Sequence, residues 1–140
     1  MDETKVIIRP YDPKTDAPLI YSTWRNALWY GDKNNVDSDE FYAQATREIK
    51  KILETSQVRI ACLSDDHDLI VGYSVMTGSN IEFVYVKLDY REKGIGALLV
   101  KGFTKISTPR TKIGWAIQKR HKLVIKEKQN VQEETKRPEA

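Results

Sequence analysis

One continuous stretch, residues 81–100, constrains this chain more than any other. Residues 81–87 are mostly β-branched, aromatic or otherwise apolar, which predicts a buried strand. Apolar residues recur again over residues 95–100, which predicts a helix. Gly94 and Gly96 lie at the junction, where they permit a tight turn that leaves backbone N–H groups uncovered at a helix N-terminus. The stretch therefore predicts a phosphate-binding site.

Two familiar phosphate motifs fit this junction poorly. A Walker loop needs Gly-Lys followed by Ser or Thr, and the junction has neither. A dinucleotide fingerprint needs a third glycine after Gly96, where the chain has Leu99. Neither motif explains the two glycines.

The junction resembles the acyl-CoA pyrophosphate motif of the GNAT superfamily of N-acyltransferases. That motif is Arg/Gln-x-x-Gly-x-Gly/Ala with a valine five residues before the arginine, and the matching residues here are Val86, Arg91, Gly94 and Gly96. The resemblance implies acetyl-CoA, or another acyl-CoA, as the cofactor.

The chain before this stretch predicts a strand, two helices and two antiparallel strands. They are expected at residues 5–9, 15–31, 37–53, 58–63 and 69–76. Thr15 or Asp16 is the expected cap of the first helix, which keeps Pro18 in its first turn. The order is β-α-α-β-β-β-α, which over residues 5–106 is also the order of the GNAT fold. We therefore expect an α/β fold with a mixed sheet and a GNAT-like core.

The C-terminal end departs from the family. Residues 111–117 predict the fifth strand, and residues 121–126 predict one more short element. The family's fourth helix and closing hairpin are then missing or remodelled, and no tyrosine follows Tyr90 to protonate the departing thiolate. The shortened layout is similar to short GNAT-like proteins of tailed phages. We expect one domain over residues 1–127 and a disordered polar tail over residues 128–140.

The resemblance also implies which residues hold the cofactor. In this family the backbone of the fourth strand pairs with the pantetheine arm, and the loop after it binds the pyrophosphate. The matching strand residues are Tyr85, Val86 and Lys87, and the matching loop residues are Arg91, Glu92, Lys93, Gly94, Ile95, Gly96 and Ala97. Solvated turn residues are the alternative interpretation of the two basic side chains in the loop.

The same resemblance suggests a catalytic base and an acceptor cleft. Glu82 is the acid of the predicted fourth strand, and it occurs in an otherwise apolar run where an unpaired charge is unfavourable. Its alternative is a strand-end carboxylate in solvent or paired with an arginine. The aromatic residues expected near the amine substrate are Trp24, Trp29, Tyr30 and Phe41. At helical spacing they also fit a hydrophobic core.

Charge is distributed unevenly along the chain. The net charge is +3, yet residues 93–126 contain nine Lys or Arg and no acid. This basic segment fits a solvated surface, attraction of a polyanionic cofactor, or nucleic acid. Phe103 and Trp115 are its aromatic residues, too few to favour recognition by base stacking.

Composition excludes other classes. No apolar run is long enough for a membrane span, and the N-terminus lacks a signal-peptide pattern. A single cysteine, Cys62, favours a reducing compartment such as the cytoplasm, and no Cys/His spacing predicts a metal site. His67 and His121 are expected at the surface. An incomplete sheet edge would favour a homodimer.

The function expected from these patterns is acetyl-CoA-dependent N-acyltransfer. The acetyl group would pass directly, in a ternary complex, to a primary amine of a small molecule or protein. The alternative is a catalytically silent GNAT-fold protein that acts in binding, such as a phage virion or interaction protein.

Overall fold

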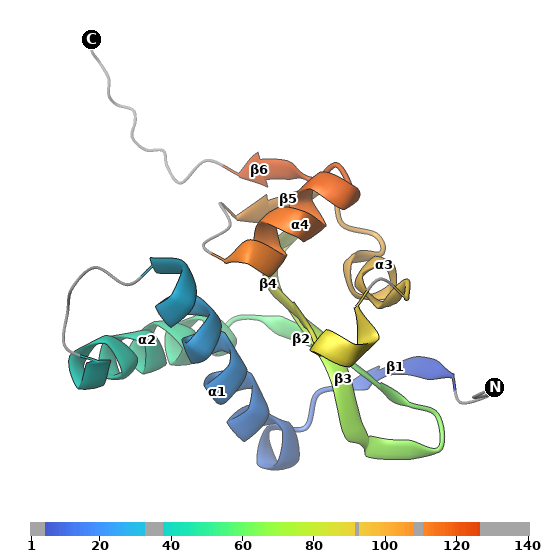
Figure 1. Ribbon diagram of the computed structural model, residues 1–140, viewed down its shortest axis with the longest axis horizontal. Helices are drawn as coiled ribbons and strands as arrows, with labels where there is room; N and C mark the ends of the chain where they lie inside the picture. The colour runs from blue at the N-terminus through green and yellow to red at the C-terminus, as the bar shows by residue number, and fades with distance from the viewer. Residues whose placement is uncertain (1–4, 33–37, 92, 108–110, 127–140) are drawn as a thin grey trace, which may run out of the picture.

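A six-stranded mixed sheet with helices on both faces forms the molecule (Figure 1). The computed structural model describes residues 5–32, 38–91, 93–107 and 111–126. The strands are β1 (Val6–Pro10), β2 (Gln57–Leu63), β3 (Asp66–Thr77), β4 (Asn80–Val86), β5 (Lys105–Ser107) and β6 (Val124–Lys126). The helices are α1 (Pro13–Asp32), α2 (Ser38–Leu53), α3 (Ile95–Val100), α4 (Lys112–Arg120) and the short 3-10 turn η1 (Leu88–Tyr90). In these ranges no helix is long and apolar enough to cross a membrane, and no His, Cys, Asp and Glu cluster could hold a metal ion.

The strands lie in the sheet in their sequence order, β1 to β6. The first four strands are antiparallel to one another in sequence order, whereas β4, β5 and β6 form parallel pairs. Parallel neighbours need crossover connections, and α3 and α4 supply them. The expected element order and mixed α/β class are confirmed.

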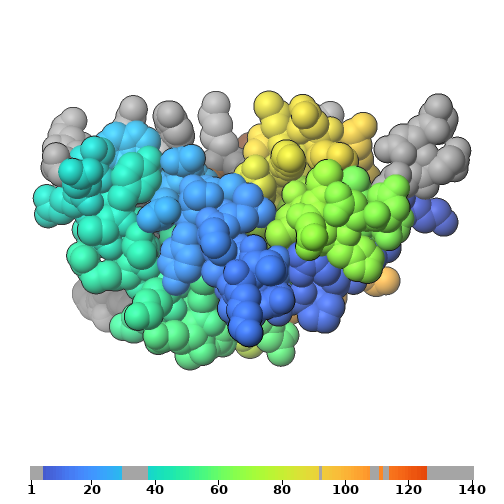
Figure 2. Space-filling model, turned by 90° about the horizontal axis from the view of Figure 1, so that it is seen from below, coloured from blue at the N-terminus to red at the C-terminus, as the bar shows by residue number. Residues whose placement is uncertain are grey.

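Two hydrophobic cores lie on opposite faces of the sheet. On one face Ile20 and Trp24 of α1 and Ile49 of α2 pack on Tyr73 and Phe83. Figure 2 shows the outer surface of this layer, with α1 in blue beside α2 in teal. On the other face α3 and α4 cover apolar residues of β2 to β5. A ligand that reaches β4 between α3 and α4 therefore approaches the sheet from this second face.

A β-bulge interrupts β4 at Glu82. Val75 pairs with Phe83 but the next residue, Met76, pairs with Ile81, so Glu82 is the extra residue. A bulge reverses the alternation of side chains, which is why Ile81 and Val84 both belong to the core beneath α3 and α4.

Side chains of the sheet fix the short helix α3. Arg59 of β2 donates to the carbonyl oxygens of Leu98 at 3.2 Å and Leu99 at 3.1 Å, and Ser74 of β3 donates to Leu99 O at 2.9 Å. These bonds satisfy carbonyl groups that a helix C-terminus leaves without partners. A helix of 6 residues is too short to persist alone, so tertiary contacts hold its position.

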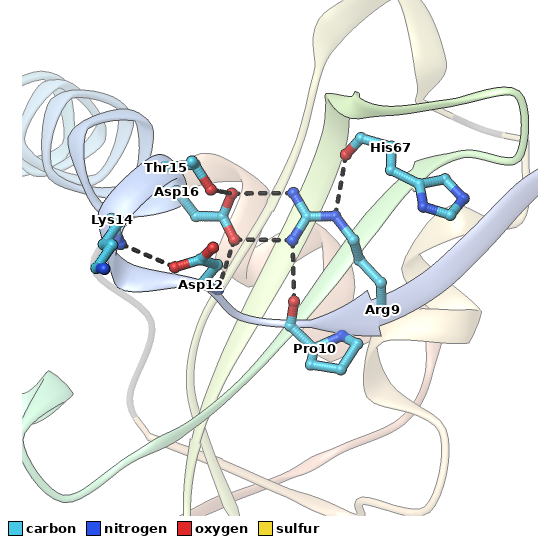
Figure 3. A network of polar contacts seen from close by, with 7 residues as sticks. All are labelled: Arg9, Pro10, Asp12, Lys14, Thr15, Asp16 and His67. Carbon is cyan, nitrogen blue, oxygen red and sulfur yellow. Dashed lines mark hydrogen bonds and ion pairs between the residues drawn. The ribbon is translucent and has the colours of Figure 1, made fainter.

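An ion pair joins β1 to the start of α1 (Figure 3). The guanidinium nitrogens Nη1 and Nη2 of Arg9 donate to Asp16 at 2.9 Å each, and its Nε donates to the carbonyl oxygen of His67 at 3.0 Å. The buried carboxylate of Asp16 also accepts from the N–H of Asp12 and the hydroxyl of Thr15. Asp16 is thus a structural ion-pair residue.

The start of α1 differs from its prediction. The helix begins at Pro13, and the side chain of Asp12 accepts from the N–H of Lys14 at 3.1 Å, so neither Thr15 nor Asp16 is its cap. Pro18 consequently lies inside the helix, where its side chain is exposed.

The C-terminal prediction was also wrong in part. Residues 111–117 belong mostly to helix α4, and the fifth strand is β5. The fourth helix is therefore present. The Thr111 hydroxyl caps its start by accepting a hydrogen bond from Gly114 N at 3.0 Å. The expected short element over residues 121–126 is β6. The predicted tail lies outside the described residues.

Candidate functional site

The strands β4 and β5 part soon after they meet. Their parallel ladder consists of two residue pairs, Asn80 with Lys105 and Ile81 with Ile106. From Phe83 to Val86, β4 has a strand partner on its β3 side only, as far as the described residues go, and Glu82 has none on either side. An unpaired edge offers N–H and C=O groups to an extended ligand, which adds to it as a further strand would.

A cavity of about 430 Å³ opens at the end of β4. Its lining residues come from the end of β4, the following loop, the first turn of α3 and the second half of α4. They are Val86, Arg91, Gly94, Gly96, Ala97, Ala116, Ile117, Arg120 and His121. The cavity thus continues the unpaired edge of β4.

The loop after β4 is shaped by Arg91 and Gly94. The Nε of Arg91 donates to the carbonyl oxygen of Val86 at 2.7 Å, which turns the side chain back toward the end of β4. Gly94 has φ 84°, in the left-handed region that favours glycine, and a Cβ built on it would have no atom within 4 Å. No described side chain therefore covers the backbone of Gly94, which lines the cavity.

Gly96 allows α3 and α4 to approach closely. A Cβ at this position would lie 2.8 Å from Cδ1 of Ile117 and 3.6 Å from Nε2 of His121. The N–H of Leu98 donates to Gly94 O at 3.4 Å, so the N–H groups before it, in the first turn, have no acceptor within the helix. They add donors to this wall of the cavity.

The charge of the cavity lining is basic. Arg91, Arg120 and His121 are its titratable side chains, and the described lining contains no carboxylate. Basic side chains beside free backbone donors suit an anionic ligand.

His121 is the lining residue that the sequence analysis misplaced. It is half-buried at the end of α4, and its Nε2 is buried without a hydrogen-bond partner in the described part of the chain. Burial lowers the pKa of its imidazole, and the neighbouring charge of Arg120 lowers it further. The expected surface position of His121 is therefore wrong, whereas His67 is exposed as expected.

Glu82 lies at the point where β4 and β5 part. Its Oε1 accepts from the Ser107 hydroxyl at 3.0 Å and its Oε2 from Nδ2 of Asn80 at 3.4 Å. Nδ2 of Asn80 also donates to Ser107 Oγ at 2.6 Å, while its Oδ1 is buried without a partner among the described residues. The half-buried carboxylate is thus held by two neutral side chains.

The cofactor residues expected from the sequence fall into two groups. Those that line the cavity are Val86, Arg91, Gly94, Gly96 and Ala97. Of the others, Ile95 is buried in the core, Lys87 and Lys93 are exposed, and Tyr85 packs on Tyr73 on the opposite face of the sheet. Glu92 lies outside the described residues.

The aromatic residues expected at the acceptor cleft lie on α1 and α2. Trp24 is 4% exposed and stacks on Phe83 with ring centroids 4.8 Å apart. Trp29 contacts Phe41 edge to face at 5.1 Å. The side chain of Tyr30 is outside the described part. Trp24 thus lies in the core, and an acceptor cleft beside the other aromatic residues stays a prediction.

The α4 wall of the cavity was missed because residues 111–117 were predicted as a strand. β-branched Ile113 and Ile117 favour that interpretation. The signal that finds the wall is the spacing of Ile117 and His121, which lie four residues apart and therefore share one helix face once Thr111 is taken as an N-cap.

No family model matches the chain, and no curated protein sequence matches it. Solved structures do. A predicted acetyltransferase from Clostridium acetobutylicum with acetyl-CoA matches with TM-score 0.57 and 18% identity over 89% of this chain and 93% of that one. A GCN5-related N-acetyltransferase from Rhodopseudomonas palustris gives 0.50 and 22% over 71% and 64%. Apo-form YjaB from Escherichia coli gives 0.51 and 16% over 69% and 63%.

The chain spans less than two thirds of the length of the last two structures, and nearly all of the first. At these identities the likeness concerns the fold. The chain has the fold of the GNAT acetyltransferases.

Proposed function

We propose that this protein is an acyl-CoA-dependent N-acyltransferase. The observation that carries the proposal is the continuity of three features: the cavity, the unpaired edge of β4, and Glu82 at the far end of that edge. Residues 82–86 span about 13 Å at the usual rise of a strand. The diphosphate of acetyl-CoA or another acyl-CoA would occupy the cavity, and its pantetheine arm would follow β4 toward Glu82. The C. acetobutylicum structure with acetyl-CoA supports this assignment.

The chemistry assigned to the site is direct transfer from thioester to amine. The amine nitrogen attacks the thioester carbonyl, so that a C–N bond forms and the C–S bond breaks. Glu82 accepts the proton that the nitrogen loses, and the departing thiolate takes a proton from water to leave as a thiol. Glu82 then returns its proton to water, so no net proton is gained or lost. A backbone N–H on the unpaired edge of β4 near the bulge would be the donor for the developing oxyanion.

The proposed acceptor is a primary amine on a small molecule or a protein. It would approach Glu82 from the α1 and α2 side, where Trp29 and Phe41 are half-buried aromatic residues. We also propose a cytoplasmic location, because the single cysteine, Cys62, is a free and buried thiol.

The second candidate is a GNAT-fold protein that binds without catalysis, like the short phage proteins that the sequence resembles. The observation that favours it is the absence of any tyrosine after Tyr90 in the sequence, because α4 then carries no phenol to protonate a thiolate. Cofactor binding with no turnover over a panel of amines would select this candidate.

Calorimetric titration of acetyl-CoA and of CoA into the protein tests the cofactor site. The matched variants are Gly94→Leu and Gly102→Leu. Both glycines have positive φ, 84° and 89°, and neither has an atom within 4 Å of a built Cβ, but only Gly94 lines the cavity. Both variants therefore carry similar backbone strain.

We expect saturable binding that Gly94→Leu abolishes and Gly102→Leu retains. A folded wild-type protein that binds neither compound refutes the cofactor site. Equal losses in both variants would mean that strain, and not the cavity, controls binding. Turnover is then sought by following thiol release with a panel of primary amines.

Two further proposals concern partners. The basic segment, residues 93–126, would attract a polyanion such as the cofactor or a nucleic acid. Affinity for nucleic acid that falls steeply as the salt concentration rises would support nucleic acid as a partner. A homodimer would use the sheet edge at β6, where Val124 is 62% exposed. Light scattering with a Val124→Lys variant tests the second proposal: a dimer that persists in the variant excludes this edge.

A further inference from the structure

The imidazole of His121 lines the cavity but has no role in the proposed transfer reaction. It lines the cavity from α4, opposite Gly96 of α3, and its Nε2 faces the region where α3 begins. This nitrogen is buried and has no partner in the described part of the chain. No hydrogen bond from the described residues to Nε2 therefore favours either protonation state of the imidazole.

The backbone fixes the imidazole at this place. The N–H of His121 donates to Ile117 O at 3.0 Å, and the next residue, Lys122, has φ 54°, which ends the helix. The side chain of Gln118 holds the following strand by donating to Leu123 O at 3.0 Å. His121 is therefore presented by a well-defined helix end.

The charged groups around the imidazole are all basic. Its neighbours in the sequence are Lys119, Arg120 and Lys122, and the cavity lining contains Arg91 and Arg120. The parts of α3 and β4 that line the cavity contribute Gly96, Ala97 and Val86, which carry no charge. None of the described side chains that line the cavity is acidic, and the carbonyl groups at the C-terminal end of α4 are what favours the protonated form in the free protein.

We propose that His121 couples cofactor binding to proton uptake: the imidazole, which lines the cavity, takes up a proton when the diphosphate of the acyl-CoA binds there. The inference rests on the proposed function. A neutral imidazole already carries a hydrogen on one of its two ring nitrogens, so a contact with phosphate does not by itself require a second proton. The negative charge of the diphosphate is what favours the protonated ring. The bound anion thus stabilises the imidazolium, which burial and the charge of Arg120 disfavour in the free protein.

The sign of the pH effect follows from this coupling. In the free protein burial and Arg120 hold the pKa of His121 below its ordinary value, and the bound anion raises it. Between these two values binding takes up one proton, so the affinity falls by about tenfold for each unit of rising pH. Below the free-state pKa the imidazole is already charged, and the affinity no longer depends on this group.

The test measures binding of dephospho-CoA by calorimetry across this pH range in two buffers of different ionisation enthalpy. Dephospho-CoA lacks the 3′-phosphate, a monoester whose own titration near pH 6 would obscure the result. The chain contains 2 histidines, so His67→Gln is the matched control for His121→Gln, and His67 lies exposed at the start of β3. Gln retains a hydrogen-bond donor but does not titrate in this range.

We expect uptake of close to one proton in the wild type and in His67→Gln, and uptake near zero with a flat pH profile in His121→Gln. The two imidazoles give separate NMR signals, and the ligand should raise the titration midpoint of His121 alone. Binding with no proton uptake, or uptake that His121→Gln retains, overturns the inference and leaves the proposed cofactor site intact. No binding of CoA or dephospho-CoA to any folded form overturns both.

Discussion

The hydroxyl of Ser107, on β5, donates to Oε1 of Glu82, on β4, at 3.0 Å, where the two strands part. Asn80 donates to both residues, so the three side chains form one polar cluster. The carboxylate proposed as the base is thus held from two strands. Its position depends on the same contacts that keep β4 and β5 together at this end.

Replacing Ser107 tests the structural part of this arrangement. Ser107→Ala leaves Oε1 of Glu82 and one donor of Asn80 without their partner, so we expect a loss of about 1–3 kcal/mol in the free energy of unfolding. Urea denaturation measures it. The control is Ser22→Ala on the exposed side of α1, where we expect a change within about 0.5 kcal/mol. Equal effects of both substitutions would contradict a special role for the cluster.

Replacing Glu82 tests the chemical part. Glu82→Gln keeps an oxygen that accepts from Ser107 but cannot take a proton from the amine, so we expect the rate of acetyl transfer to fall by about 10²–10⁴-fold. The dissociation constant of acetyl-CoA should change little, because Glu82 does not line the cavity. Unchanged turnover with an amine that the wild type accepts would remove Glu82 as the base.

The hydrogen bonds from Arg59 to α3 predict a link between stability and cofactor binding. Arg59→Met keeps an unbranched side chain beside Phe103 but loses both bonds to the helix, and we expect about 1.5–3 kcal/mol less stability together with weaker binding of acetyl-CoA. Arg25→Met is the control. Arg25 donates to Tyr21 O and to the Thr46 hydroxyl on the opposite face of the sheet. The Arg25→Met variant should lower the free energy of unfolding and leave binding of acetyl-CoA unchanged. Weaker binding in both variants would show that the position of α3 does not link stability to binding.

Local sequence predicts one wall of the candidate site and not the other. The strand, the turn at Gly94 and the start of α3 follow from apolar runs and glycines that are adjacent in the sequence. The second wall comes from α4, whose β-branched residues favour a strand until the Thr111 cap is recognised. The partners of Glu82 and the burial of His121 depend on contacts between distant residues, which the sequence pattern does not contain. Five of the ten expected cofactor residues line the cavity, all of them in the continuous stretch from β4 to α3. His121 comes from the other wall and was not predicted there.

The ion pair between Arg9 and Asp16 predicts an acid-sensitive contribution to stability (Figure 3). Hydrogen bonds from Arg9 hold the pKa of Asp16 below its ordinary value, against the opposing effect of burial. A lowered pKa in the folded protein means that this contribution is present above the unfolded pKa, about 4, and is lost as the pH falls below it. Asp16→Asn removes the charge and leaves Arg9 facing a neutral side chain.

We therefore expect Asp16→Asn to unfold more easily than the wild type near neutral pH, by roughly 3 kcal/mol, because one partner of a largely buried pair is lost. Asp16 is 1% exposed, so solvent does little to replace that partner. The difference between the two proteins should shrink as the pH falls below about 4, where the carboxylate of the unfolded chain becomes protonated, and should be lost once the pH falls through the lowered pKa of the folded protein. Urea denaturation over this range measures it, with Asp68→Asn, an exposed acid of β3, as the control. A difference that stays constant with pH would mean that packing at Asp16, and not its charge, stabilises the junction of β1 and α1.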